Sequence, residues 1–150
     1  MDAATLTSIG KIGGSLVFGL SAIGSGLGAG VAAMAGIGAW KKCYAQSKAA
    51  PFMIVAFIGA PLSQTIYGMI VMRWIADAAE KSAQPWSLLA AGLLAGFAIG
   101  MSALMQGKAC ASASDALGET GQGFGNSLMA IGIIETVALF SLVFIGRVIG

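Results

Sequence analysis

The chain has 150 residues, of which 57% are hydrophobic and 9% are charged, and its formal net charge is +2. Soluble domains carry about 25% charged residues, so a water-soluble fold could not cover this much apolar surface. The net charge is small and spread along the chain, so it gives no support for a nucleic-acid partner. The composition predicts an integral membrane protein.

Four apolar segments are each long enough to cross about 30 Å of hydrocarbon as a helix. They cover about residues 12–40, 49–72, 85–107 and 123–146. Helices are predicted rather than barrel strands because the segments are long and unbroken. The connections are short, so consecutive helices should be antiparallel neighbours. The predicted fold class is therefore an all-α membrane protein with four transmembrane helices.

The sequence contains an internal repeat. The aligned segments are 25–32 with 102–109, and 63–65 with 134–136. This pattern predicts two tandem antiparallel hairpins, residues 1–80 and residues 81–150, that arose from one duplicated unit. The second repeat has Glu135 at the place where the first repeat has Gln64.

Basic residues suggest an orientation in the membrane. The first loop carries Lys41, Lys42 and Lys48, and short loops rich in lysine favour the cytoplasm. We therefore predict that loops 41–50 and 108–121 are cytoplasmic and that both termini lie outside. Because lysine and arginine are equally numerous on the two sides overall, this prediction depends on the first loop.

Glycines crowd the first apolar segment. Gly24 with Gly28, and Gly26 with Gly30, have the four-residue spacing that lets helix backbones approach closely in lipid. Because these small residues occupy more than one face, they predict contacts on several sides. This is typical of an inner helix in a tightly packed ring.

Glu135 is the only charged residue between Gly121 and Gly146. An ionisable group in the middle of a membrane span costs about 2.5–3.5 kcal/mol on insertion scales, so its first interpretation is functional. The rest of the chain can be interpreted as a scaffold that holds this carboxylate within the membrane and gives it something to bind.

The second apolar segment has a polar face that could meet Glu135. Ala60, Ser63, Gln64 and Tyr67 have the i, i+3, i+4 and i+7 spacing of one helix face. Pro61 has no N–H, so the helix should loosen there and leave a carbonyl oxygen available. Ser63 and Gln64 could instead serve only to hold helices together, and Tyr67 could serve only in packing.

The third apolar segment adds Gln106, its only long polar side chain. Counted from a turn near Gly118, Gln106 lies about 18 Å and Glu135 about 25 Å along their helices. A contact between them therefore requires some stagger of the two helices. Gln106 could also be an interfacial residue.

The collected groups are a carboxylate, two amide oxygens, a hydroxyl and a backbone carbonyl, with one negative charge among them. A hard monovalent cation suits such a set, whereas a divalent metal usually recruits more carboxylates. A proton would satisfy Glu135 without the other groups. The set therefore favours Na⁺, with H⁺ as the alternative.

Over nearly its whole length the chain resembles the duplicated proteolipid of V-type rotary ATPases, the K or c-type subunit of the membrane rotor ring. The motifs that carry the resemblance are the glycine-rich first segment, Pro61-x-Ser-Gln-x-x-Tyr-Gly68, Gln106-Gly-Lys108 and Ile134-Glu-Thr136. One glutamate for two hairpins is typical of the family. The resemblance also implies that copies of the chain form a ring.

The site pattern is most similar to that of bacterial members that transport sodium. The resemblance implies Na⁺ ligands at Glu135, Gln64, Gln106, Ser63 and the Ala60 carbonyl, with Tyr67 hydrogen-bonded to Glu135. The chain differs in having Ser63 where threonine is usual, although the hydroxyl is kept. The implied partners are a stator membrane subunit bearing an arginine, central-stalk subunits and lipid. ATP is hydrolysed or made by other subunits, and this chain is expected to have no catalytic residues of its own.

Two other classes of protein fit the four segments less well. A small exporter could exchange protons for a cationic compound at Glu135, but it would need an aromatic-lined cavity around the carboxylate. A structural or channel-forming protein could use Glu135 as a hydrogen-bonding residue between helices. Neither class explains the duplication.

Overall fold

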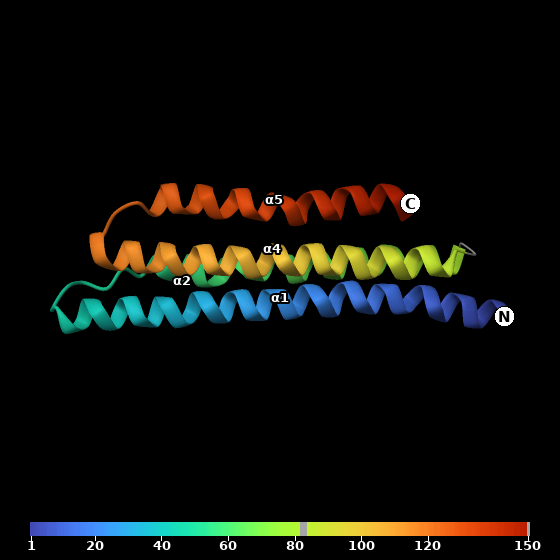
Figure 1. Ribbon diagram of the computed structural model, residues 1–150, viewed down its shortest axis with the longest axis horizontal. Helices are drawn as coiled ribbons and strands as arrows, with labels where there is room; N and C mark the ends of the chain where they lie inside the picture. The colour runs from blue at the N-terminus through green and yellow to red at the C-terminus, as the bar shows by residue number, and fades with distance from the viewer. Residues whose placement is uncertain (82–83, 150) are drawn as a thin grey trace.

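The computed structural model describes residues 1–81 and 84–149, and these residues form an all-helical bundle. Four stretches are long and apolar enough to cross a membrane: α1 (Ala3–Ala45), Ile54–Lys81, α4 (Pro85–Thr120) and α5 (Phe124–Ile149). The second stretch consists of α2 (Ile54–Gly59), the 3₁₀ turn η1 (Ala60–Leu62) and α3 (Ser63–Lys81). All four lie along one axis (Figure 1). The predicted fold class is confirmed.

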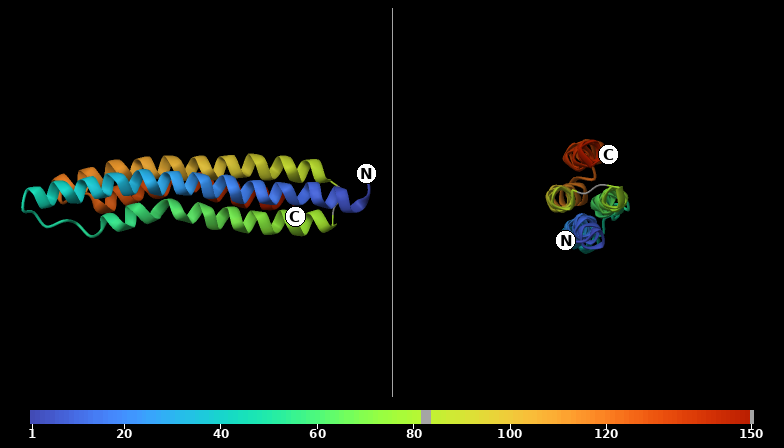
Figure 2. Two further views of the ribbon diagram at one scale, coloured as in Figure 1. Left: turned by 90° about the horizontal axis from the view of Figure 1, so that it is seen from below. Right: turned by 90° about the vertical axis from the view of Figure 1, so that its right-hand side faces the viewer.

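Seen along the axis, the four stretches form a diamond (Figure 2). The helices α1 and α5 occupy opposite corners, and α3 and α4 lie between them. The most extensive packing joins α1 to α4, and α5 packs on both α3 and α4. The N-terminus and C-terminus lie at one end of the bundle, and the α1–α2 and α4–α5 connections lie at the other (Figure 1).

Glycines let the backbones of α1 and α4 touch. A Cβ added at Gly24 would lie 2.1 Å from the carbonyl oxygen of Gly100, and one added at Gly92 would lie 2.0 Å from that of Gly13. These distances leave no room for side chains, as expected for closely packed helices in lipid. Because Gly13 faces Gly92 and Gly24 faces Gly100, the two helices run parallel. We call this contact the glycine seam.

The end of α4 differs from the prediction. Most of the expected loop 108–121 is helical, because α4 continues to Thr120. One face of this extension is buried, with Cys110 and Leu117 among its buried side chains, so packing supports a helix that hydropathy alone would end earlier. Gly121 then takes the left-handed conformation, with φ of 68°, and its N–H donates to the Leu117 carbonyl at 2.9 Å. This is a common helix terminus for glycine.

The second apolar stretch begins later than predicted. It starts at Ile54 rather than near residue 49, so Pro51 precedes the helix. The indole N–H of Trp40 donates to the Pro51 carbonyl at 2.9 Å and holds this connection against α1. Pro85, in contrast, lies in the first turn of α4, where a proline is tolerated.

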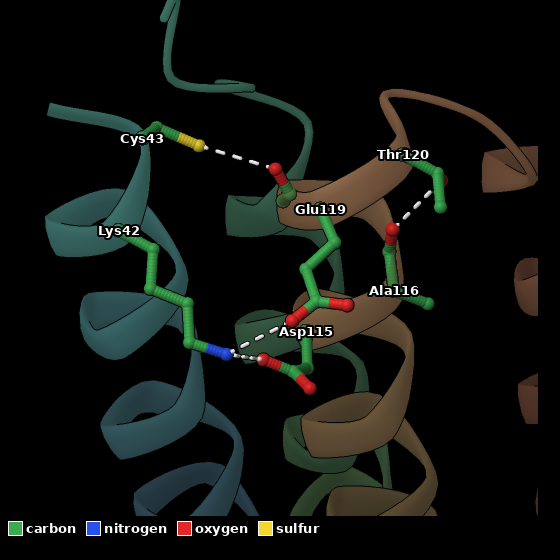
Figure 3. Close-up of polar contacts among 7 residues, drawn as sticks. Lys42, Cys43, Asp115, Ala116, Glu119 and Thr120 are labelled. Atoms are coloured by element: carbon green, nitrogen blue, oxygen red, sulfur yellow. Dashed lines mark hydrogen bonds and ion pairs between the residues drawn. The ribbon is translucent and has the colours of Figure 1, made fainter. Parts of the chain in front are cut away.

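Ion pairs join helices at both ends of the bundle. Lys11 Nζ lies 2.9 Å from Glu80 Oε1 near the termini. At the other end, Lys42 Nζ lies 2.7 Å from Asp115 Oδ1 and 3.2 Å from Glu119 Oε1 (Figure 3). Lys11 and Lys42 are about 46 Å apart along α1, close to the ~40–45 Å of a bilayer with its headgroups.

Candidate ion-binding site

The site lies on the inner side of α5, near the middle of that helix. Glu135 is half-buried and faces α3 and α4. The structure brings together all six residues that the sequence predicted for the site. They are Ala60, Ser63, Gln64, Tyr67, Gln106 and Glu135.

Three hydrogen bonds from two other helices hold the Glu135 carboxylate. Oε1 accepts from the Ser63 hydroxyl at 2.6 Å and from the Tyr67 hydroxyl at 2.7 Å. Oε2 accepts from Gln106 Nε2 at 3.2 Å. With donors directed at both oxygens, the arrangement suits an ionised carboxylate, which can only accept hydrogen bonds.

Oxygen atoms outnumber protons around the Ser63 hydroxyl. Besides Glu135 Oε1, its Oγ lies 3.2 Å from Gln64 Oε1 and 3.2 Å from the Ala60 carbonyl oxygen. A serine hydroxyl carries one proton, so it can donate to only one of these three acceptors. The shortest contact, to Glu135, identifies that acceptor. Four oxygens of different groups therefore lie together, and of these four oxygens only that of Ser63 carries a proton that it can donate.

The two glutamines form a buried chain behind the carboxylate. Both side chains are fully buried, and Gln64 Nε2 donates to Gln106 Oε1 at 2.7 Å. Gln106 Nε2 also lies 3.2 Å from the Ile131 carbonyl oxygen. The Gln106 amide thus presents its nitrogen, not its oxygen, to Glu135. To bind a cation through Oε1, this amide would have to turn over and exchange its partners.

The structure reduces the expected offset between Gln106 and Glu135 along the bundle and reverses its direction. The α4–α5 turn lies at residues 121–123 rather than near Gly118. Counted from Gln122, Gln106 is about 24 Å and Glu135 about 20 Å along their helices. The remaining difference is small enough for the side chains to span.

The loosened turn predicted at Pro61 is confirmed. Residues Ala60–Leu62 form a 3₁₀ turn between α2 and α3. Proline removes a helical N–H donor and so favours such an interruption. The turn places the Ala60 carbonyl oxygen 3.2 Å from the Ser63 hydroxyl oxygen.

Sequence reasoning assigned no role to Ser102, which belongs to the same cluster. Its hydroxyl donates at 2.9 Å to the carbonyl of Ile134, the residue before Glu135. The i, i+4 spacing of Ser102 and Gln106 was the available signal, since it places both on one face of α4. Its counterpart in the first repeat, Ser25, is buried, and its hydroxyl has no hydrogen-bond partner among the residues described.

A protein-family match covers part of the second hairpin. Residues 89–145 match the family of the C subunit of ATP synthase. We call residues 89–145 the C-subunit segment. It contains Gln106 and Glu135, whereas Ala60, Ser63 and the rest of the α2–α3 face lie outside it.

A second comparison covers most of the chain. A protein of Methanocaldococcus jannaschii, named as the K subunit of an A-type ATP synthase, is 33% identical to it over 134 residues. The similar region is 89% of this chain and 58% of that relative. The similarity therefore extends beyond the C-subunit segment into the first hairpin, and the chain spans less than two thirds of the relative's length.

Proposed function

We propose that this chain is the membrane rotor subunit of an A/V-type rotary ATPase, and that it carries Na⁺ across the membrane on Glu135. Three observations support the assignment to a rotor. Residues 89–145 match the C-subunit family of ATP synthases, the similarity to a K subunit covers both hairpins, and four helices are able to span a membrane. In this proposal, residues 1–80 and 81–150 are the two duplicated hairpins.

The outward glycines of α1 support assembly into a ring of identical copies. At Gly19, Gly26 and Gly30, an added Cβ would meet no atom of another helix within 4 Å among residues 1–81 and 84–149. Their seven- and four-residue spacing places them on one helix face. Small residues on a free face allow another helix to approach closely in lipid, so this face suits a neighbouring copy.

The cluster of four oxygens around the Ser63 hydroxyl is the main observation that supports Na⁺ as the transported ion. A cation placed among the four oxygens would gain ligands from Ala60, Ser63, Gln64 and Glu135. The Ser63 hydroxyl oxygen lies within 3.2 Å of the oxygens of the other three residues. One carboxylate would balance its single charge. Oxygen ligands and one negative charge suit a hard monovalent ion.

The same geometry supports a transport mechanism. A bare carboxylate is costly in hydrocarbon, whereas Glu135 paired with Na⁺ forms a neutral site that can face lipid. In a turning ring, each Glu135 would load an ion from one access path and release it at another. An arginine of the stator subunit is the proposed partner that displaces the ion.

The ATP chemistry is assigned to other subunits. In the proposed complex this chain binds central-stalk subunits, a stator membrane subunit and lipid, and it catalyses no bond chemistry itself. The complex resides in the cell membrane. We place the connections at one end of the bundle, residues 46–53 and 121–123, on the cytoplasmic side. Lys48 lies in the first of them, and Lys41 and Lys42 lie beside it at the end of α1.

H⁺ is the second candidate cargo. Gln106 presents Nε2 to Glu135, and its Oε1 already accepts from Gln64, so in this arrangement Gln106 supplies no oxygen to a cation. A proton would not need one. The exporter alternative has less support, because the groups bonded to Glu135 are a serine, a glutamine and one tyrosine rather than an aromatic cage.

The test is carbodiimide labelling of Glu135 in the purified oligomer, with Na⁺ or K⁺, across a range of pH. Carbodiimide reacts with an accessible protonated carboxyl group, so an ion bound to Glu135 should slow the reaction. Under the proposal, Na⁺ protects Glu135 at neutral pH and K⁺ does not. Labelling that follows pH alone would identify a proton site.

Two variants make the test specific. Glu135→Gln should remove the protected labelling while the oligomer stays assembled. Glu119→Gln, at an exposed carboxylate at the end of α4, should leave it unchanged. Protection that persists in Glu135→Gln would refute the central role of this residue.

A further inference from the structure

A second polar region lies far from Glu135, at the end of the bundle where the termini meet. It is a cavity of about 860 Å³ between the end of α3, the start of α4 and the end of α5. Lys81 and Asp77 line it from α3, and Arg147 lines it from α5. None of these residues belongs to the ion site, and transport on Glu135 gives them no role.

The charges of the cavity leave one positive charge to be balanced. Its lining contains two cations, Lys81 and Arg147, and one anion, Asp77. Within residues 1–81 and 84–149, the ion pair at this end joins Lys11 to Glu80, and neither cavity cation has an ion-pair partner. A single monoanionic group would neutralise this lining.

The part of the cavity nearer the middle of the helices is apolar. It is lined by Trp74, Leu88 and Val143, and Trp74 is 39% exposed. Gly146 lets the indole lie directly against α5, since a Cβ there would be 2.7 Å from Trp74 Cζ3. The cavity therefore combines a cationic mouth with an apolar floor, and this is the polarity of a phospholipid.

The position along the helices matches the membrane interface. The helix α5 has 26 residues, and Arg147 is the third from its end. At 1.5 Å per residue the helix is about 39 Å long, which exceeds the ~30 Å hydrocarbon layer, so Arg147 lies at the level of the headgroups. Tryptophan is enriched at the same level.

We propose that this cavity binds an anionic phospholipid, with its phosphodiester between Lys81 and Arg147 and an acyl chain along Trp74 and Val143. Arginine holds phosphate oxygens through paired N–H donors. Lysine and arginine near a membrane surface are also attracted to anionic lipids. The binding is independent of which ion Glu135 carries, and it would hold α3 to α5 at the end opposite the α4–α5 turn.

Fluorescence quenching of Trp74 tests the proposal in the full chain. Trp40 and Trp86 are replaced by phenylalanine, and the protein is reconstituted into phosphatidylcholine bilayers. Phosphatidylglycerol or phosphatidylcholine with brominated acyl chains is then compared at equal mole fraction. We expect brominated phosphatidylglycerol to bind about 5-fold more tightly near Trp74, the effect of roughly one basic residue at an anionic lipid surface.

Charge variants separate this site from general attraction to the membrane. Lys81→Gln with Arg147→Gln should abolish the preference, whereas Lys81→Arg with Arg147→Lys should keep it. Lys41→Gln with Lys48→Gln removes the same charge at the other end of the bundle and should also keep it. Circular dichroism confirms that each variant is folded.

Three results would overturn the proposal. They are equal quenching by the two lipids in the parent protein, a preference that survives in Lys81→Gln with Arg147→Gln, and loss of the preference when excess inorganic phosphate is added. The last result would mean that the cavity binds free phosphate rather than a lipid.

Discussion

Replacing Ser63 with alanine tests the oxygen cluster most directly. The substitution removes a hydroxyl that donates to Glu135 Oε1 at 2.6 Å and lies 3.2 Å from two further oxygens. A hydrogen bond to a charged group contributes about 1.5–3 kcal/mol, and every 1.4 kcal/mol changes affinity about tenfold. We therefore expect Ser63→Ala to weaken Na⁺ binding about 10- to 150-fold, and its half-buried position favours the lower part of this range.

The assay is the Na⁺ concentration that half-protects Glu135 from carbodiimide at neutral pH. Ser63→Thr keeps the hydroxyl and should bind Na⁺ nearly as well as the parent. Ser141→Ala is the matched control, because its hydroxyl bonds only within α5, to the Val137 carbonyl at 2.9 Å. Unchanged protection in Ser63→Ala would show that this hydroxyl is not a ligand and that the oxygen cluster is not the ion site.

Three further predictions address the scaffold and the site. Gly24→Ala should destabilise the bundle by about 1–3 kcal/mol or more, because its Cβ would lie 2.1 Å from the Gly100 carbonyl oxygen. Gly26→Ala is the control and should unfold in detergent as the parent does, because its Cβ would meet no atom of another helix within 4 Å in the described part of the chain. Gln106→Leu should lower both the unfolding temperature and Na⁺ affinity, the latter about tenfold, because it removes a donor to the carboxylate and leaves a buried amide unpaired. Lys42→Gln should leave thermal unfolding nearly unchanged, since its ion pairs are solvent-exposed, and a large loss of stability would contradict this interpretation.

The composition of the site could be predicted from sequence because polar groups are conspicuous in apolar segments. Glu135, Gln64 and Gln106 are costly to bury alone, so each had to have a partner, and the helical spacing of Ser63 and Tyr67 indicated a face that could supply some of them. The orientation of the Gln106 amide could not be predicted. It depends on the Gln64 and Ile131 contacts, which only the packed helices define.

The helix ends were harder to predict than the helices themselves. The extension of α4 to Thr120 is rich in alanine and serine, and its low hydropathy resembles a loop. It is helical because it packs against neighbouring helices, and that packing is absent from any local sequence signal. The parallel contact of α1 and α4 was likewise not predicted, because the glycines of α1 occupy several faces and their spacing does not identify the partner of each.

The glycine seam has a consequence for how the two kinds of hairpin are ordered. It joins the hairpin that carries Gln64 to the one that carries Glu135, and both belong to a single polypeptide. Two separate hairpins of such similar shape could exchange places in an oligomer, and their order would vary from one oligomer to the next. A covalent link of a few residues gives each hairpin a high effective concentration of its own partner. In the proposed ring, repeats with Glu135 and repeats with Gln64 would therefore alternate regularly, and the spacing between the Glu135 carboxylates would be uniform.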